Sequence, residues 1–571
     1  MKDKKMYILL VISILFAVVG ISLAFFSLNI IGNDTAKYNK ITTGDLELVF
    51  TDDNEVSLDG AFPGDSITKT ISVKNTGTKE VSYNIVWQEL LNEITNNELV
   101  IDGTCKNLNS SNTEDGECSA ISKKAVKEGN ITSNIPIKPG YTQEYEVKIT
   151  FIDTGKPQNY NKNKSFKGKL GLTESSVKTI YCTYDGELTQ GAEYVNGQYT
   201  YRYMQESNGS SWKNITISGW GVQLTDKTST DAVTSKPCTY INDKPVVSMA
   251  YMFFDSQATT LDLSNFDTSK VTNMESMFAH SQFTLLNLNN FNTSKVTNMT
   301  AMFYNSQATT LDLNSFNTSK VTNMYGMFSY SKATTIDVSN FDTSNVISMK
   351  QMFANSMVKR LDVRNFDTSN VTDMNFMFGQ SSIIEIKGIN NFNTSKVTDM
   401  SNMFRISFCT TLDVSSFDTS NVTDMSSMFY ASQATTLDVS NFNTKNVTNM
   451  YGMFQSSKAK TIVGLQNFDT SNVTGMQEMF SYIQATTIDV SNFDTRNVTN
   501  MNSMFENSSN LKTIYVNNKF DVSKVTNSTS MFLGCTNLVG GAGTKYNSTK
   551  VDKTYARIDG GTSSPGYFTA K

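Results

Sequence analysis

The fold is decided by one repeated stretch, Val271-Thr-Asn-Met-Glu-Ser-Met-Phe-Ala-His-Ser-Gln-Phe-Thr-Leu-Leu-Asn-Leu-Asn-Asn-Phe-Asn-Thr-Ser-Lys295. Twelve units of this 25-residue pattern run from Val246 to about Phe532, and their initial valine returns at Val296, Val321, Val346, Val371, Val397, Val422, Val447, Val473, Val498 and Val525. Fixed periods of 20–50 residues are typical of stacked architectures, because one unit cannot bury its apolar face alone. The sequence therefore predicts a solenoid with a long, regular surface.

Each unit contains the pattern of two short elements. Val271, Met274, Met277 and Phe278 have helical spacing and predict a short helix or helical turn. The triplet Leu261-Asp262-Leu263 predicts a short strand with its two leucines inward and its aspartate outward. One strand and one helical turn per 20–29 residues is the leucine-rich-repeat scheme, so we expect a leucine-rich-repeat solenoid of about twelve coils.

The regular apolar positions of the units predict a shared core. Of the 27 methionines, 23 occupy the positions of Met274 and Met277, and of the 35 phenylalanines, 23 occupy those of Phe266 and Phe278. Such rows could bind an aromatic or sulfur-preferring ligand, but stacked packing explains them more simply. Two units carry an extra glycine inside the strand pattern, Gly388 and Gly464, which predicts a β-bulge at each.

The chain begins with the pattern of a membrane anchor. Three lysines precede an uncharged run of 27 residues from Met6 to Gly32, or roughly 40 Å as a helix, which exceeds a bilayer core of about 30 Å. Positive residues stay on the cytoplasmic side, so the rest of the chain is expected outside, at the cell surface. Ser22 and Ala24 are small residues at the spacing that a signal peptidase needs, so cleavage after Ala24 and secretion remain an alternative.

The remaining composition divides the chain into successive parts. Alternating apolar residues at 46–50, 67–73, 81–87 and 145–151 predict an all-β sandwich. A tyrosine-rich segment before the repeats predicts a small β module that caps the solenoid. The expected parts are an anchor at 1–32, a linker at 33–40, the sandwich at 41–174, the cap module at 175–244, the solenoid at 245–535 and a C-terminal cap at 536–571.

Six cysteines fit an oxidising compartment. Cys105 and Cys118 flank a polar loop, and Cys182 and Cys238 bracket the cap module, so we expect two disulfides, with buried free thiols as the alternative. Cys409 and Cys535 replace small residues of the repeat and predict packing in the core.

No catalytic constellation is found in the sequence. The single histidine, His280, falls at a variable position and predicts a solvated side chain, and no metalloprotease, serine-hydrolase or phosphate-loop motif occurs. We therefore expect no enzyme, no cofactor and no metal site. The net charge of −5 over 571 residues argues against nucleic acid as a partner.

One row of charge remains as a candidate site. Adjacent coils would place outward carboxylates roughly 5 Å apart. Such a row could bind a basic partner or calcium, although ordinary solvated carboxylates are the simpler explanation. The row consists of Asp262, Asp312, Asp337, Asp362, Asp413, Asp438 and Asp489.

Two resemblances suggest a function. The stretch from Pro63 to Ile85 resembles the β-sandwich of TasA- or camelysin-like matrix proteins. Repeats such as Phe417-Asp-Thr-Ser-Asn-Val-Thr-Asp-Met-Ser-Ser-Met-Phe429 look like those of BspA-like leucine-rich-repeat surface proteins. The second resemblance implies a bacterial adhesin that binds host, matrix or bacterial surface proteins, whereas the first implies a structural matrix or surface-layer component that assembles through its sandwich.

Overall fold

The computed structural model describes residues 37–43, 46–52, 55–78, 80–155, 157–175, 179–204, 218–264 and 266–571. The anchor expected at residues 1–32 lies outside these ranges and stays a prediction. Within them, no helix combines the length and the apolar composition that a bilayer crossing requires.

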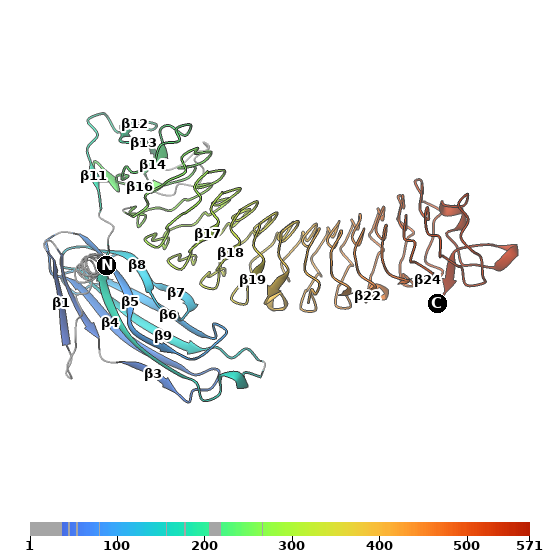
Figure 1. The fold of residues 1–571 in the computed structure, drawn as a ribbon, viewed down its shortest axis with the longest axis horizontal. Helices are drawn as coiled ribbons and strands as arrows, with labels where there is room; N and C mark the ends of the chain where they lie inside the picture. Colours follow the sequence, from blue (N-terminus) through green and yellow to red (C-terminus); the bar gives the residue numbers. More distant parts are fainter. Residues whose placement is uncertain are drawn as a thin grey trace, which may run out of the picture.

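Two β-sheets that share one buried core form the N-terminal part, called here the sandwich (Figure 1). The larger sheet has the order β1-β2-β4-β9-β6-β7 and the smaller has the order β3-β10-β5-β8. Their strands are β1 (Lys37–Thr43), β2 (Leu46–Asp52), β3 (Val56–Asp59), β4 (Ser66–Asn75), β5 (Val81–Asn92), β6 (Leu99–Leu108), β7 (Ile121–Ala125), β8 (Asn130–Ile137), β9 (Thr142–Phe151) and β10 (Ser165–Glu174), and the 3₁₀ turn η1 (Asn159–Asn161) precedes β10.

Alternation along the strands builds the sandwich core, as the sequence predicts. In β9, Tyr145, Val147 and Ile149 are fully buried while the residues between them face solvent. The Tyr83 hydroxyl donates to Gln143 Oε1 at 2.6 Å and lies 3.0 Å from the Tyr145 hydroxyl, so the polar ends of the buried rings are satisfied.

The expected linker at 33–40 is wrong for its last four residues. Residues 37–40 begin strand β1, which pairs antiparallel with β2 over its whole length. The polar composition that suggested a linker is also that of an edge strand, and β1 is an edge of the larger sheet.

A six-stranded sheet covers the N-terminal end of the repeats. Leu224 donates its backbone N–H to Met252 O at 2.9 Å, and the Tyr199 ring lies 6.3 Å from the Phe266 ring. The cap sheet therefore closes an end at which apolar side chains would otherwise be exposed. Its order is β11-β15-β16-β14-β13-β12, with strands β11 (Tyr181–Cys182), β12 (Glu193–Asn196), β13 (Tyr199–Met204), β14 (Gly219–Leu224), β15 (Tyr240–Ile241) and β16 (Lys244–Ser248).

The repeats stack as a β-solenoid. Eleven parallel bridges in succession join the residue two positions after each initial valine, from Ser248 to Asn527 in the described part of the chain. Twelve units thus give eleven turns, about 53 Å long at roughly 4.8 Å per step. Parallel strands join neighbouring coils in the pairs β17 (Thr310–Leu311) and β18 (Thr335–Ile336), β19 (Arg360–Asp362) and β20 (Glu385–Lys387), β21 (Thr436–Asp438) and β22 (Thr461–Val463), and β23 (Thr487–Asp489) and β24 (Thr513–Val516).

The strand prediction is confirmed in its orientation. Leu311 and Leu313 are buried, and Asp312 between them is exposed. The same residues pack against the Met and Phe rows in a single core that runs from the cap sheet to the C-terminal end.

The short helix or helical turn predicted for each unit is not what the structure shows. In the segment from Met274 to Ser281, tight turns replace it, because Ser276 and His280 have φ angles of 52° and 59°. A left-handed residue at every fourth position interrupts a right-handed helical path. The positions equivalent to Ser276 and His280 are left-handed in every coil.

Hydrogen bonds between coils replace those of a helix. Ser276 N–H donates to Thr300 O at 2.8 Å, Phe278 N–H to Met302 O at 2.9 Å and His280 N–H to Tyr304 O at 2.8 Å. The intervening N–H groups bond within the coil, as Ala279 does to Ser276 O at 3.2 Å. The apolar residues keep helical spacing, but the backbone is satisfied only when the next coil is present.

Side chains stack in register along the interior. The Phe278 ring lies 5.6 Å from Phe303, nearly parallel at 5°, and Phe303 lies 5.7 Å from Phe328 at 3°. Buried threonines add hydrogen bonds between coils, as Thr293 Oγ1 does to Asn317 O at 2.8 Å. Core packing therefore accounts for the Met and Phe rows.

The two extra glycines form turns and not β-bulges. Gly388 and Gly464 directly follow strands β20 and β22, have φ angles of 89° and 96°, and lead into the 3₁₀ turns η2 (Ile389–Asn391) and η3 (Leu465–Asn467). Each extra residue is absorbed after the strand, where the chain does not pair with its neighbour.

The C-terminal residues cover the last coil. Strand β25 (Phe568–Ala570) pairs parallel with β24, and Phe532 N–H donates to Val551 O at 2.9 Å. The Asp559 carboxylate accepts hydrogen bonds from Ala542 N–H and Thr544 N–H, both at 2.9 Å. The 3₁₀ turns η4 (Lys553–Tyr555) and η5 (Gly561–Ser563) complete this region.

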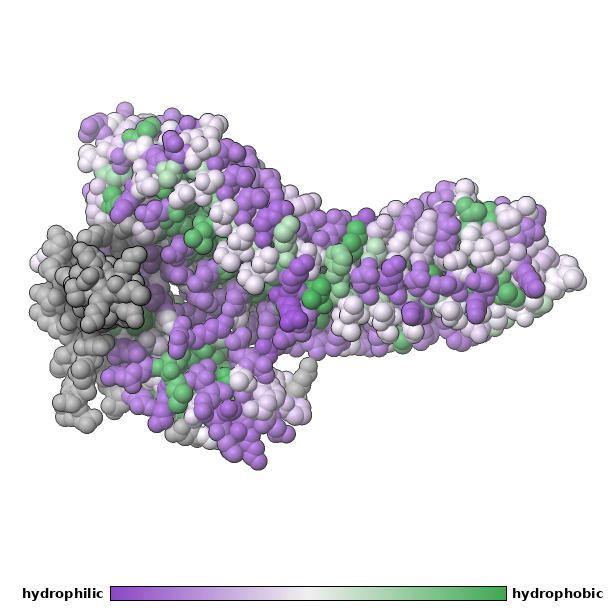
Figure 2. All heavy atoms as spheres, viewed as in Figure 1, coloured by the Kyte–Doolittle hydropathy of each residue, from purple (hydrophilic) through white to green (hydrophobic). Residues whose placement is uncertain are grey.

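The sandwich lies beside the first coils, and the solenoid extends away from it toward the C-terminus (Figure 1). On the face drawn in Figure 2, polar side chains cover most of the solenoid, and hydrophobic ones form scattered spots.

Candidate functional site

The predicted acidic row lies along the strand face of the solenoid, and its first role is structural. Every one of the seven carboxylates accepts a hydrogen bond from the backbone N–H two residues later, at 2.9–3.3 Å, which defines an Asx turn. The pairs are Asp262 with Ser264, Asp312 with Asn314, Asp337 with Ser339, Asp362 with Arg364, Asp413 with Ser415, Asp438 with Ser440 and Asp489 with Ser491.

Cations interrupt the acidic row. Asp337 pairs with Lys127 of the sandwich at 2.5 Å, Asp362 pairs with Arg364 at 2.7 Å, and Asp489 contacts Lys571. Burial alone would raise the pKa of Asp489, but the hydrogen bonds from Lys571 and Ser491 outweigh it and lower the pKa. Partner binding by this row stays a prediction, and the row is not one run of unpaired carboxylates. Among the described residues, no three His, Cys, Asp or Glu side chains converge as a metal site.

The cysteines are arranged as two bridges and two thiols. Disulfides join Cys105 to Cys118 and Cys182 to Cys238. Cys409 and Cys535 are buried and reduced, and burial raises the pKa of Cys535 to about 12, so its thiolate is not available near neutral pH.

A row of three lysines faces the sandwich from the first three coils. Lys270 pairs with Glu80 at 3.4 Å, and Lys320 pairs with Glu117 at 2.8 Å. Lys295 lies between them in the same register. The two outer lysines thus join the solenoid to acidic groups of the sandwich, and we call Lys270, Lys295 and Lys320 the lysine row.

Polar contacts extend this interface over four coils. Asn292 Nδ2 donates to Asn134 O at 2.8 Å, and the hydroxyls of Ser119 and Ser294 lie 3.0 Å apart. One ion pair has the charges reversed, because here the sandwich supplies the cation, Lys127, and the solenoid supplies the anion, Asp337. Ser119 directly follows Cys118, so the Cys105–Cys118 disulfide holds one part of the contact surface in place.

A row of aromatic rings occupies a different corner of the first coils. The Phe254 ring lies 5.5 Å from His280, His280 lies 5.2 Å from Tyr304, and Tyr304 lies 5.5 Å from Tyr330. The His280 Nδ1 atom shares a 3.0 Å hydrogen bond with the Asn305 amide. Tyr330 is 45% exposed, and the other three rings are partly exposed, so solvent reaches the whole aromatic row.

Comparison with protein families identifies the repeats. The family model described as "Mycoplasma protein of unknown function, DUF285" matches residues 235–283, 247–360, 280–386, 355–463 and 456–564, which together span more than half of the chain. The chain belongs to the DUF285 family. No curated protein matches the chain, and no solved structure does.

The DUF285 repeats contain both rows described above, and the sandwich lies outside the matched residues. The lysine row and the aromatic row are therefore features of the DUF285 coils, whereas Glu80 and Glu117 belong to the part that precedes them.

Sequence reasoning missed the lysine row, although a signal existed. The position of Lys270 holds Asn in most later DUF285 coils, and Asn345 and Asn370 each donate to the carbonyl of the coil before, at 2.8 Å. Lysine in the first three coils breaks that pattern where the sandwich docks. The Asp-x-Ser pattern after each strand likewise signals the Asx turns. The sequence predicts a solvated His280 but not its contacts with Phe254 and Tyr304. Those contacts depend on the left-handed turn at His280, which the sequence pattern did not predict.

Proposed function

We propose that this protein is a cell-surface adhesin whose solenoid binds protein ligands on host, matrix or bacterial surfaces. The observation that carries the proposal is the aromatic row of Phe254, His280, Tyr304 and Tyr330. Tyrosine is among the residues that dominate binding energy at protein interfaces. Rings that already contact one another lose little conformational freedom when a partner binds.

The position of the row also supports a binding role. The sandwich contacts the lysine corner and the Asp337 side of the coils, and the aromatic row lies at the corner after each Met-Phe pair. A partner on the aromatic row would therefore not have to displace the sandwich.

We also propose that the repeats are of the BspA-like type and that the chain is attached to the cell membrane. The repeats look like BspA-like leucine-rich repeats, and the segment at 1–32 would anchor the chain in the membrane with its C-terminal part outside. Cleavage after Ala24 would instead release the protein. Either way, the solenoid would be exposed to extracellular partners, and the acidic residues Asp312, Asp413 and Asp438 would be open to basic groups of such a partner.

Direct binding tests the adhesin proposal. The protein from residue 33, without the expected anchor, is applied to immobilised matrix proteins and to bacterial cells, and bound protein is quantified. The double variant Tyr304→Ala/Tyr330→Ala should lose most of the binding. Alanine fits both sites, because Ala279 and Ala431 occupy the same two registers in other coils. Tyr482→Ala, in the register of Tyr330 but far along the solenoid, serves as the matched control.

The results separate the outcomes clearly. Binding that falls with the double variant and persists with Tyr482→Ala supports an adhesin that uses the aromatic row. Binding that is unchanged in the double variant, or absent from every surface, contradicts it.

A structural matrix component is the second candidate, and the edges of the sandwich favour it. Of the four sheet edges formed by the described strands, β7 and β8 lie toward the solenoid, as the contacts of Lys124 and Asn134 indicate. Within that part of the chain, β1 and β3 are the edges that would pair with another chain. Filaments of the purified protein in electron micrographs, formed at low concentration without surface binding, would favour this candidate.

A further inference from the structure

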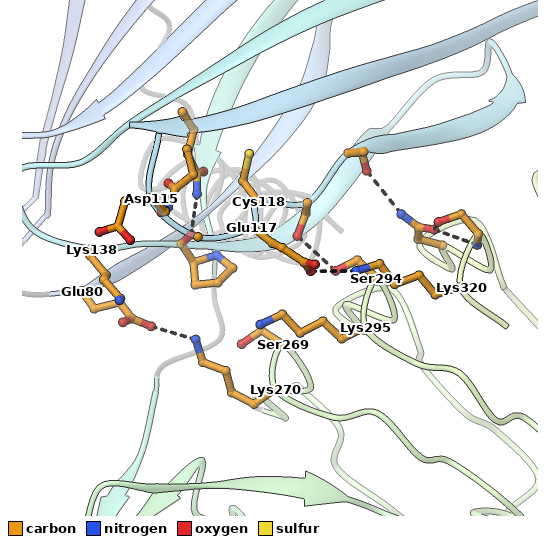
Figure 3. A pocket seen from close by; sticks show the side chains of 18 of the residues that line it. Glu80, Asp115, Glu117, Cys118, Lys138, Ser269, Lys270, Ser294, Lys295 and Lys320 are labelled. Carbon is orange, nitrogen blue, oxygen red and sulfur yellow. Dashed lines mark hydrogen bonds and ion pairs between the residues drawn. The ribbon is translucent and has the colours of Figure 1, made fainter. Parts of the chain in front are cut away.

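A cavity of about 370 Å³ lies between the sandwich and the first three coils (Figure 3). The lysine row forms one wall, and the loop that ends at Cys118 forms the opposite wall. We propose that this cavity is a binding site for a phosphate group, held by the Lys295 ammonium and the Ser269 hydroxyl. This site is independent of partner binding by the aromatic row.

Lys295 is the lysine of the row that makes no ion pair within the described residues. Lys270 and Lys320 on either side of it pair with Glu80 and Glu117, and among the described residues no hydrogen bond or ion pair is made by the Lys295 ammonium. Burial, together with the neighbouring charges of Lys270 and Lys320, outweighs the attraction of Glu117 and Glu80 and lowers the pKa of Lys295. A partly buried ammonium without a partner is unfavourable, and an anion in the cavity would relieve that cost.

Within the described part of the chain, Ser269 adds a second buried polar group without a partner at the cavity. Its side chain is 2% exposed, and its hydroxyl has no hydrogen-bond partner among the described residues. In Figure 3 the Ser269 oxygen and the Lys295 nitrogen point into the same space beside the Lys270–Glu80 pair. Buried hydroxyls are nearly always hydrogen-bonded, so a ligand oxygen between these two groups would satisfy both.

The charge balance of the walls favours an anion. The lining includes one more basic than acidic side chain, and both glutamates already pair with lysines. Asp115 accepts the Tyr141 hydroxyl at 2.6 Å, so it is also engaged. The charged lining residues are Glu80, Asp115, Glu117, Lys138, Lys270, Lys295 and Lys320.

Stacking does not explain why a lysine stands at position 295. Most later coils place Asn in this register, and the amide then bonds to the preceding coil, as Asn345 does to Ser319 O at 2.8 Å. The Lys295 side chain makes no such hydrogen bond to the preceding coil and no other one within the described residues. Its ammonium is therefore available to bind an anion in the cavity. A tetrahedral phosphate suits the site, because lysine binds phosphate as a point charge and the several oxygens can reach separate donors. At about 30 Å³ per water, the cavity has room for a phosphate and for atoms attached to it.

Titration calorimetry of the full-length protein with inorganic phosphate, at constant ionic strength, tests the site. We expect one saturable site, with affinity lowered at least tenfold by Lys295→Asn and several-fold by Ser269→Ala. Lys396→Asn is the matched control, because Lys396 occupies the same register far from the sandwich and bonds to Asn370 at 2.7 Å. It should leave the affinity unchanged.

Further titrants decide the class and the source of the ligand. Acetate should bind at least tenfold more weakly than phosphate. Tighter binding of glycerol phosphate than of inorganic phosphate would identify an attached phosphoryl group, and the reverse order would identify the free ion. The proposal fails if wild type shows no saturable binding, if Lys295→Asn and Ser269→Ala both bind as wild type does, if Lys396→Asn weakens binding as much as Lys295→Asn, or if acetate binds as tightly as phosphate.

Discussion

Lys270 of the first coil and Glu80 of the sandwich form an ion pair at 3.4 Å, with only 17% and 16% of their side chains exposed. Burial alone would lower the pKa of Lys270, but the charge of Glu80 and the contact with Tyr240 outweigh it and raise the pKa. The pair lies 190 residues apart in sequence, so it joins two parts of the chain that fold around separate cores.

Loss of the Glu80 charge should weaken this junction. Glu80→Gln leaves Lys270 without its counter-ion in a mostly buried position, so we expect the free energy of unfolding of the sandwich to fall by about 2 kcal/mol. Urea denaturation measures this change. Glu193→Gln is the control, because the Glu193–Arg202 pair is about half exposed and should contribute no more than about 1 kcal/mol. Equal effects of the two substitutions would show that Lys270 is not buried against the sandwich.

The phenylalanine row should be sensitive to the loss of one ring. Phe341 is 1% exposed and packs 6.4 Å from Phe328, so Phe341→Ala should lower the free energy of unfolding by about 3–5 kcal/mol through cavity formation. Denaturant melts and amide exchange in the coils around residue 341 would report it. A loss below about 1 kcal/mol would be inconsistent with a close-packed core at this position.

The two kinds of left-handed glycine should respond differently to alanine. At Gly388 an added Cβ would lie 2.6 Å from the backbone of Arg364, whereas at Gly326 the nearest atoms are 3.8 Å away. Gly388→Ala combines a left-handed backbone with a clash, and we expect a loss of more than about 2 kcal/mol. Gly326→Ala should cost about 1 kcal/mol or less, because Ala301 adopts the same conformation one coil earlier. Thermal melts compare the two, and similar losses would contradict the close approach at Gly388.

Lys124 should make stability depend on pH above neutrality. Burial, reinforced by Lys127, lowers the pKa of Lys124 to about 8, whereas an unfolded lysine has a pKa of about 10.4. Between these values the unfolded chain binds a proton that the folded chain lacks, so the folded state gains stability as pH rises, by up to about 1.4 kcal/mol per pH unit.

Urea melts of wild type and Lys124→Met at pH 7.5, 8.5 and 9.5 isolate this effect from other titrating groups. The difference between the two proteins should change in favour of wild type as pH rises. Parallel pH dependences would show that Lys124 keeps its ordinary pKa and is not buried between the carbonyl oxygens of Asn130 and Asn314.

The sequence was sufficient for the repeat period, for which strand side chains face inward or outward, and for the core. The alternation in Leu311-Asp312-Leu313 and the repeated Phe278 position encode burial directly, because both are properties of one coil. The backbone between Met274 and Ser281 could not be predicted in the same way. Its apolar spacing suits a helix as well as a series of turns, and only the hydrogen bonds to the following coil decide between them.

The candidate site was predictable in part. The carboxylates of the acidic row do face outward, but their Asx turns and their cations depend on residues near and far in sequence, such as Ser264 and Lys571. The cavity beside Lys295 could not be predicted at all, since its walls come from the sandwich and the solenoid and depend on how the two dock.

Docking of the sandwich on the first coils determines which surfaces are free for a partner, and it creates the phosphate site. Carbodiimide cross-linking of the full-length protein, read by mass spectrometry, tests it most directly, because the reagent joins only carboxylates and amines in contact. We predict links between Glu117 and Lys320, 2.8 Å apart, and between Asp337 and Lys127, 2.5 Å apart. The Asp489–Lys571 contact within the solenoid is the internal positive control. Recovery of that control link without either link between the sandwich and the solenoid would contradict the docked arrangement.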